Sequence, residues 1–259
     1  TIGVTYNGTI WMAVGQGGNT MAYSYDGIFW NGMGSFTFTS FGFGIAWNGN
    51  VWVATGSGGN TLAYSSNGFN WVGLGSTVFT SQANRIYWGG NAFVAVGSGT
   101  NSLAYSTNGV TWTALGATIF STQGLGISWN GRIWIAGGQG TNSLAYSQNG
   151  VTWVGISPTP FTTYSYGAAW NGLMWVGVGQ GTNTLAYSYD GITWFGLGSI
   201  TFNAAGYSIL WTGNVWIAGG QGGNSIAYSY NGNVWTGLGF PGLALFTSYA
   251  YCIGWSGSY

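Results

Sequence analysis

Residues 43–74 read FGIAWNGNVWVATGSGGNTLAYSSNGFNWVGL, and this stretch decides the fold. It contains four short runs rich in aromatic and β-branched residues, which favour strands. Asn48-Gly49 separates the first two runs, a glycine-rich loop at 56–60 the middle two, and Asn67-Gly68 the last two. Asn-Gly favours the type I′ turn of tight hairpins. The stretch therefore predicts four antiparallel strands, at 43–47, 51–55, 61–65 and 70–74.

The same pattern recurs every 41 residues. Three positions of the repeat are almost always tryptophan, and all 17 tryptophans of the chain fall on them. A residue type confined to repeat positions is first of all a packing residue. The three series are Trp11, Trp52, Phe93, Trp134, Trp175 and Trp216; Trp30, Trp71, Trp112, Trp153, Trp194 and Trp235; and Tyr6, Trp47, Trp88, Trp129, Trp170, Trp211 and Trp255.

Four strands in each unit of about 40–45 residues are typical of a β-propeller blade. One small sheet cannot bury both of its faces, whereas sheets arranged around an axis bury them against one another. We predict an all-β fold: a single six-bladed β-propeller domain over 1–259, with four antiparallel strands in each blade. The expected repeats are approximately 1–40, 41–81, 82–122, 123–163, 164–204 and 205–248, followed by a closing strand at 249–259. A linear β-solenoid is the alternative, disfavoured because its rungs are usually shorter and need no Asn-Gly hairpins.

The first strand of the repeat occurs seven times, whereas the other three strands occur six times. Two of its seven copies lie at the ends of the chain, at Thr5-Tyr6 and at Ile253–Trp255, so one of these two is in excess. We therefore expect the terminal strands to close the ring, with the C-terminal copy beside the N-terminal blade. Cys252 lies in this closing strand and is expected to be a small buried residue.

Charged residues make up 2% of the chain, and the net charge is +0. The whole charged set is Asp26, Arg85, Arg132 and Asp190. Two arginines cannot supply the counterion release that drives nucleic-acid binding, so that partner class is excluded. No apolar run approaches the length of a membrane-spanning helix, so no membrane insertion is expected. Without histidine and with one cysteine, the sequence predicts no metal site and no cofactor.

The turn between the third and fourth strands carries a motif. It reads Ser24-Tyr-Asp-Gly-Ile-Phe-Trp30 in the first repeat and Ser188-Tyr-Asp-Gly-Ile-Thr-Trp194 in the fifth. This resembles the Asp-box of bacterial neuraminidase repeats, Ser-x-Asp-x-Gly-x-Thr-Trp, with one residue missing between Asp and Gly. All six repeats carry it, with Asn in place of Asp at Asn67, Asn108, Asn149 and Asn231. In that family the box is a structural turn away from the catalytic face, so the resemblance implies a propeller and little about activity. The charge-poor repeats also resemble repeat proteins of giant DNA viruses.

The sialidase activity of that family does not fit these residues. It needs an arginine cluster, a Tyr–Glu nucleophile pair and an acid Asp, and this chain has no glutamate. Arg85 begins a first strand and Arg132 lies in a turn, at opposite ends of a blade, so we expect no shared ligand. Asp26 and Asp190 occupy equivalent turns of the first and fifth repeats, too far apart for the roughly 5–9.5 Å of a glycosidase pair. We predict that the chain has no catalytic residues and is not an enzyme.

The loops between the second and third strands are the candidate ligand sites. Their amide side chains and glycine backbone form a neutral hydrogen-bonding surface, and repetition of the site allows avidity. This resembles the six-bladed propeller lectins. The alternative is that the asparagines bond the backbone of their own loops, as Asn does in turns. The candidate ligand-binding residues are Gln16, Asn19, Ser57, Asn60, Ser98, Asn101, Gln139, Asn142, Gln180, Asn183, Gln221 and Asn224.

These residues predict a non-enzymatic binding module for multivalent glycan or surface recognition, located extracellularly or on a virion surface. The alternative is a structural subunit of a virion, fibre or extracellular surface assembly. A net charge near zero favours that alternative because it removes the repulsion that keeps proteins apart. The partners would then be further copies of the chain or other surface proteins.

Overall fold

The computed structural model describes residues 2–239 and 249–254. These residues form 24 strands and no helix, which confirms the all-β prediction. No helix of the described residues is long and apolar enough to span a membrane. The chain divides into two compact units, Thr1–Ile127 and Ser128–Tyr259, and each is described by itself. The single-domain limits and the blade number of six stay predictions.

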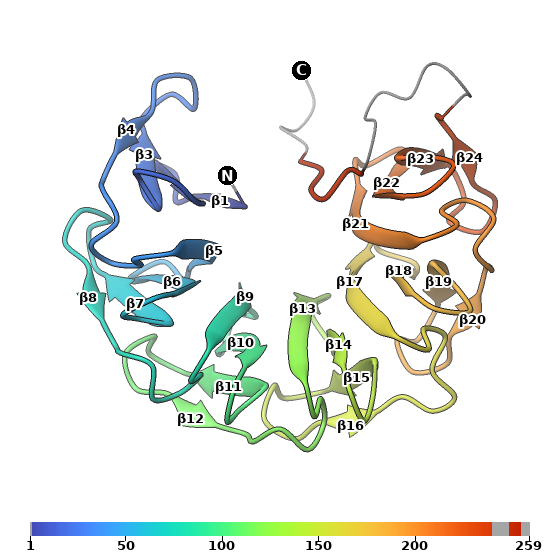
Figure 1. The fold of residues 1–259 in the computed structure, drawn as a ribbon, viewed down its shortest axis with the longest axis horizontal. Coiled ribbons are helices and arrows are strands. Elements are labelled where there is room, and N and C mark those ends of the chain that lie inside the picture. Colours follow the sequence, from blue (N-terminus) through green and yellow to red (C-terminus); the bar gives the residue numbers. More distant parts are fainter. Residues whose placement is uncertain (1, 240–248, 255–259) are drawn as a thin grey trace. The chain divides into compact units, whose positions relative to one another are not determined.

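In the first unit consecutive strands pair antiparallel: β1 to β4 form a four-stranded sheet, and single bridges join the later groups of four into a larger sheet, β6 to β9 at Ser57–Gln82 and β10 to β13 at Ser98–Gln123. Within the unit β1, β5 and β9 lie side by side, while the short β4, β8 and β12 form the opposite edges of their sheets (Figure 1). Its strands are β1 (Gly3–Tyr6), β2 (Trp11–Val14), β3 (Met21–Ser24), β4 (Asn31–Gly32), β5 (Phe41–Trp47), β6 (Trp52–Ser57), β7 (Leu62–Ser65), β8 (Val72–Gly73), β9 (Gln82–Trp88), β10 (Phe93–Ser98), β11 (Leu103–Ser106), β12 (Thr113–Ala114) and β13 (Gln123–Trp129), which crosses the unit boundary.

The second unit follows the same order. The strands β17 to β20 form one four-stranded antiparallel sheet and β21 to β24 another. First strands again contact each other, since β17 packs against β21. The strands are β14 (Trp134–Gln139), β15 (Leu144–Ser147), β16 (Val154–Gly155), β17 (Tyr164–Trp170), β18 (Trp175–Gln180), β19 (Leu185–Ser188), β20 (Phe195–Gly196), β21 (Ala205–Trp211), β22 (Trp216–Gln221), β23 (Ile226–Ser229) and β24 (Thr236–Gly237).

The hairpin turns differ from the predicted type I′. That turn needs positive φ at both central residues, and no described residue other than glycine has positive φ. In the turn after β5, Gly49 has φ of 99°, while the Asn48 Oδ1 accepts the backbone N–H groups of Asn50 and Val51. The asparagine therefore folds an Asx turn with its side chain and needs no left-handed backbone. Asn7 in the turn after β1 does the same.

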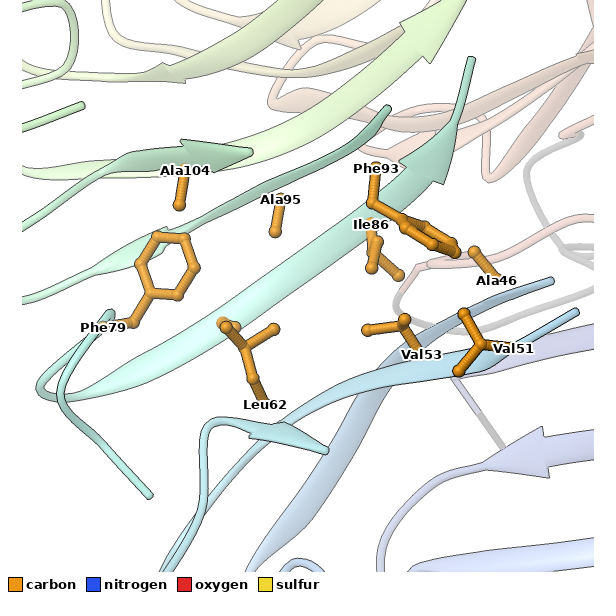
Figure 2. Packing of buried hydrophobic residues seen from close by; sticks show 10 residues of the cluster. Ala46, Val51, Val53, Leu62, Phe79, Ile86, Phe93, Ala95 and Ala104 are labelled. Atoms are coloured by element: carbon orange, nitrogen blue, oxygen red, sulfur yellow. The ribbon is translucent and has the colours of Figure 1, made fainter. Parts of the chain in front are cut away.

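The core lies between neighbouring sheets. In the first unit, Val51, Val53 and Leu62 lie opposite Ile86, Phe93 and Phe79 (Figure 2). Phenylalanines from the connections between sheets are fully buried, at 0% exposure, and include Phe38, Phe79, Phe120, Phe161 and Phe202. These rings therefore anchor the connections between sheets in the core.

One of the three tryptophan series is buried except for its first member, Trp11, which is half-buried. The second-strand residues Trp52, Trp175 and Trp216 are 0% exposed. The series that ends the first strand is half-buried and lies against it, as in the Trp47–Trp52 pair, whose ring centroids are 5.0 Å apart. The tryptophans of the Asp-box-like turns are half-buried as well, except Trp30, which is 40% exposed.

The two terminal copies of the first strand have different surroundings. The strand β1 pairs with β2 along its whole length, so the N-terminal copy completes the first sheet. Tyr249 forms a bridge with Gln221, and the Ala250 N–H donates to the Gly220 carbonyl oxygen at 3.0 Å, so the C-terminal copy begins against the last sheet. Trp255 lies outside the described residues, and closure of a ring stays a prediction. The expected burial of Cys252 is wrong, because its side chain is exposed.

Candidate functional site

The predicted loop asparagines bond to the backbone of the chain. In Asn183, the Nδ2 donates to the Pro160 carbonyl oxygen at 2.6 Å, and the Oδ1 accepts the Gly198 N–H at 2.7 Å. Each such amide ties its loop to the connections before and after its own sheet. Asn60 and Asn224 make the same two bonds, Asn101 makes the first and Asn19 the second, and Asn142 also has a partner. The sequence alternative had each asparagine bonding the backbone of its own loop, whereas the partners seen here lie in the connections on either side, such as Pro160 and Gly198 for Asn183.

The close fit of these amides explains a recurrent glycine in the fourth strand. A Cβ added to Gly196 would lie 2.2 Å from the Asn183 Oδ1, and one added to Gly73 would lie 2.2 Å from the Asn60 Oδ1. A side chain there would displace the amide from its two backbone partners. The third repeat carries Ala114 at this place, and Asn101 still donates to the Val78 carbonyl oxygen at 2.6 Å.

The other predicted loop residues lie where each second strand ends. Ser57 and Ser98 form backbone bridges with the first residue of the following sheet, and Gln16 forms an equivalent bridge. The Gln221 Oε1 accepts a hydrogen bond from the Tyr207 hydroxyl at 2.7 Å. Gln139 and Gln180 are half-buried, whereas Gln16 is exposed. The structure therefore leaves Gln16, Gln180 and the glycine backbone as the groups of this loop surface that can meet a ligand.

Threonine hydroxyls fix the tips of these loops. The Thr100 N–H donates to the Thr80 Oγ1 at 2.9 Å, and the Thr182 N–H donates to the Thr162 Oγ1 at 3.0 Å. The loops are thus held from both sides without any charged group.

The Asp-box-like turns lie at the opposite end of the strands. In the fifth repeat the Asp190 Oδ1 accepts the N–H groups of Ile192 and Thr193 at 2.8 and 2.7 Å, and the Trp194 Nε1 donates to the Gly191 carbonyl oxygen. Asn108 makes the same two backbone bonds in the third repeat. Asp and Asn therefore build one turn, which confirms a structural role for this residue.

The backbone donors also act on the charge of the two aspartates. The pKa of Asp26 is lowered, first by the N–H of Phe29 and then by that of Ile28. For Asp190, partial burial acts to raise the pKa, but the N–H groups of Thr193 and Ile192 with the hydroxyls of Ser188 and Thr193 lower it on balance. Both carboxylates therefore stay ionised in mild acid.

A hollow of about 370 Å³ lies at this turn end in the second unit. The turn after β13 contributes Arg132, the end of β17 contributes Trp170, and the turn after β19 contributes Tyr189 and Asp190. Arg132 is exposed, and the Tyr189 side chain is 60% exposed. The remaining walls are Asn130, Ile133, Gln148 and Ile192. The hollow combines one cation, one anion, two amides, two aromatic rings and apolar side chains.

Sequence reasoning did not bring Arg132 and Asp190 together. The two residues are in neighbouring repeats, one in a turn between first and second strands and the other in a turn between third and fourth strands. In an antiparallel sheet these two kinds of turn lie at the same end, which is the signal that was available. Arg85 is placed differently: its Nη1 donates to the carbonyl oxygens of Phe43 and Asn84 at 3.2 and 2.9 Å.

The start of the first strands forms a second distinctive region of the second unit. Tyr166 and Tyr207 have ring centroids 5.0 Å apart, and Tyr207 and Tyr251 have centroids 4.6 Å apart. Burial raises the pKa of Tyr166 to about 12, with further contributions from Tyr207, Tyr164 and Tyr251. The pKa of Tyr207 is also raised, first by burial and then by its tyrosine neighbours. These phenols stay neutral well above physiological pH.

The described residues contain no group of three or more His, Cys, Asp or Glu side chains that could hold a metal ion. The groups of the hollow are suited to binding through hydrogen bonds and ring contacts.

No family model matches the sequence, and no curated protein matches it. Solved structures of β-propeller-like proteins are similar to it. "YCF48 from Cyanidioschyzon merolae" is 16% identical with a TM-score of 0.62, over 91% of this chain and 84% of that one. A chain of the mitotic checkpoint complex is 12% identical with a TM-score of 0.65, over 89% and 76% of the two chains. The GH74 enzyme of Niastella koreensis is 17% identical with a TM-score of 0.62, and 36% of its chain is covered.

These likenesses concern the fold alone. They support propeller repeats, and they do not single out the Asp-box type, which rests on the turn residues of this chain. The similar structures include both an enzyme and a member of a protein complex, so the fold by itself assigns no activity.

Proposed function

We propose that this chain is a non-enzymatic recognition module, a six-bladed β-propeller of the shortened Asp-box type that binds glycans multivalently through the loops between its second and third strands. The observation that carries the proposal is the repetition of one uncharged, fastened loop. In five copies, at Asn19, Asn60, Asn101, Asn183 and Asn224, the asparagine is bonded to the backbone. The glycines beside these loops are exposed, as at Gly17, Gly58 and Gly181.

Because the loop asparagines are bonded to the backbone, they are not expected to contact the ligand themselves. Their amides hold the loop in shape, so the ligand contacts fall to Gln16, Gln180 and the backbone N–H and carbonyl groups of the glycines. A loop that is already ordered loses little conformational freedom when it binds. Weak single sites are then amplified by repetition when the glycan is polymeric.

The test compares a neutral polysaccharide with its monosaccharide, using surface plasmon resonance on the full chain. We expect the polymer to bind much more tightly than the monomer, and Gln16→Ala together with Gln180→Ala to weaken polymer binding. Thr77→Ala, an exposed residue outside the loops, is the matched control. A folded protein that binds no neutral polysaccharide would refute the proposal.

A second function, a subunit of a virion, fibre or extracellular surface layer, is favoured by one specific observation. Phe36 is 94% exposed and Ile200 is 93% exposed, at equivalent places in two of the connections beside these loops. Exposed apolar side chains on an almost uncharged surface favour association. Sedimentation velocity at rising concentration tests this function, and replacing both residues by serine should abolish any assembly that forms.

A further inference from the structure

The hollow at Arg132 and Asp190 is not part of the repeated loop surface. It lies at the other end of the strands, and it is lined by an arginine from one repeat and an aspartate from the next. No other repeat has a charged residue equivalent to Arg132; the equivalents are Thr9, Asn50, Asn91, Leu173 and Asn214. Asp190 has a charged equivalent in Asp26, whereas the other four repeats carry Asn at this position. A pair of opposite charges that the fold does not require calls for another explanation. We propose that this hollow is a separate ligand site, which binds one neutral sugar ring through vicinal hydroxyl groups.

Both charged groups keep hydrogen-bonding capacity for a ligand. Among the described residues, the guanidinium of Arg132 makes no ion pair and no side-chain hydrogen bond, and it offers five N–H donors. The Asp190 Oδ1 is taken up by Ser188, Ile192 and Thr193, whereas the Oδ2 accepts only the Thr193 hydroxyl, at 3.1 Å. The Oδ2 can therefore accept a further donor.

The aromatic walls supply the apolar part of the site. Trp170 packs on Trp175 with ring centroids 5.4 Å apart, which fixes the indole, and it also lines the hollow. Tyr189 packs edge-on against Tyr187, at 5.8 Å between centroids, and most of its surface is free. Fixed rings of this kind can receive the C–H face of a sugar, and Ile192 adds to the same apolar surface.

The mixed charge selects the class of ligand. An anionic ligand would meet the Asp190 carboxylate, and a cationic ligand would meet Arg132. Two adjacent hydroxyl groups suit both, because one can accept from the guanidinium while the other donates to the carboxylate. The volume of about 370 Å³ lies near the lower end of the range of small-molecule sites, which indicates one ring or two rather than a long chain.

The experiment measures binding of D-mannose, D-galactose and L-fucose to the full chain by isothermal titration calorimetry, with N-acetylneuraminic acid as the anionic comparison. We expect at least one neutral sugar to bind with a stoichiometry of one per chain and to bind more tightly than the anionic sugar. Arg132→Asn should weaken it at least tenfold, and so should Asp190→Asn. Both variants carry residues that occupy equivalent places in other repeats, so they are expected to fold.

The matched control is Asn50→Ala, at the place in the first unit that is equivalent to Arg132, and it should leave the binding unchanged. Unchanged sugar binding in Arg132→Asn, stronger binding of the anionic sugar, or no binding of any neutral sugar would overturn the inference. Polysaccharide binding that depends on Gln16 and Gln180 would still support the loop proposal, so the two failures are distinguishable.

Discussion

The core cluster around Phe79 in the first unit and the cluster around Phe161 in the second are built from equivalent residues, two repeats apart. Val51, Val53 and Leu62 in the first correspond to Ile133, Ile135 and Leu144 in the second, and both phenylalanines are fully buried. The same two units differ in their polar and ring contacts. Asn84 donates to the Gly124 carbonyl oxygen at 2.7 Å, whereas Tyr166 at the equivalent place packs against Tyr207.

The turn end shows the same contrast. Asn50 and Asn108 in the first unit correspond to Arg132 and Asp190 in the second, and the backbone bonds of the turns at Asn108 and Asp190 are alike. Side chains that vary while the backbone and the core stay constant are not needed for folding. The comparison therefore separates residues that build the repeat from residues that are available for recognition.

The largest effect on stability is expected when equivalent buried rings are removed from the cores of the two units. We expect Phe79→Ala and Phe161→Ala each to lower the free energy of unfolding by about 3–5 kcal/mol, because each removes a buried ring and leaves a cavity. Urea denaturation followed by tryptophan fluorescence measures both. Thr111→Ala in the first unit and Thr152→Ala in the second, at equivalent exposed turn residues that bond through the backbone N–H, are the controls. A loss in one unit of less than a third of that in the other would show that the two cores are not equivalent.

A smaller loss is expected for the loop asparagines. Asn183→Ala and Asn101→Ala should each cost about 1–3 kcal/mol, since each leaves part-buried backbone groups without their partner. Chemical denaturation gives the cost, and Gln180→Ala in the same loop should change stability by less than about 0.5 kcal/mol. Full stability in both asparagine variants would contradict a structural role and return these residues to the set of ligand contacts.

The sequence predicted the strands and the repeat because both depend on regular spacing, as the series Trp52, Trp175 and Trp216 illustrates. It did not predict the course of the Asn48 turn or the bonding of Asn183. A short polar side chain can bond the nearby backbone in several ways, and spacing does not choose among them. The hollow was not predicted for another reason. Its two charged residues, Arg132 and Asp190, lie in turns of successive repeats, and the 41-residue spacing aligns equivalent residues without showing which different turns meet.

The rings of Tyr166, Tyr207 and Tyr251 form a cluster in the second unit, and the stability of this unit should depend on pH through Tyr166. The pKa of Tyr166 is about 12 in the folded chain, above its ordinary value, so the folded state favours the neutral phenol. The contribution of Tyr166 to stability is therefore complete below about pH 10 and is lost as the pH rises through its folded pKa. Absorbance titration at 295 nm should show a late phase whose amplitude Tyr166→Phe lowers, because the pKa of Tyr207 is also raised and Tyr207 still titrates late. Tyr25→Phe, at an exposed residue, should leave the amplitude of that phase unchanged, and an unchanged amplitude in Tyr166→Phe would contradict the contribution of Tyr166.

The smallest effect is expected at the turn that tolerates both Asp and Asn. Asp190→Asn should change stability at neutral pH by less than about 0.5 kcal/mol, because Asn108 makes the same two backbone bonds. The wild type should lose slightly more stability than the variant on acidification. The lowered pKa of Asp190 means that its charged form stabilises the folded chain, and this contribution disappears as the carboxylate is protonated below about pH 4.

Thermal unfolding of the two proteins between pH 7 and pH 2.5 measures this difference. The reciprocal substitution Asn108→Asp in the first unit should add the same acid sensitivity at that turn, beside the one already expected from Asp26. If Asp190→Asn instead unfolds the chain at neutral pH, the carboxylate has a structural task that the other turns lack. In that case Asp190 would serve folding and not ligand binding, because the second unit would need a carboxylate where the first unit has the amide of Asn108.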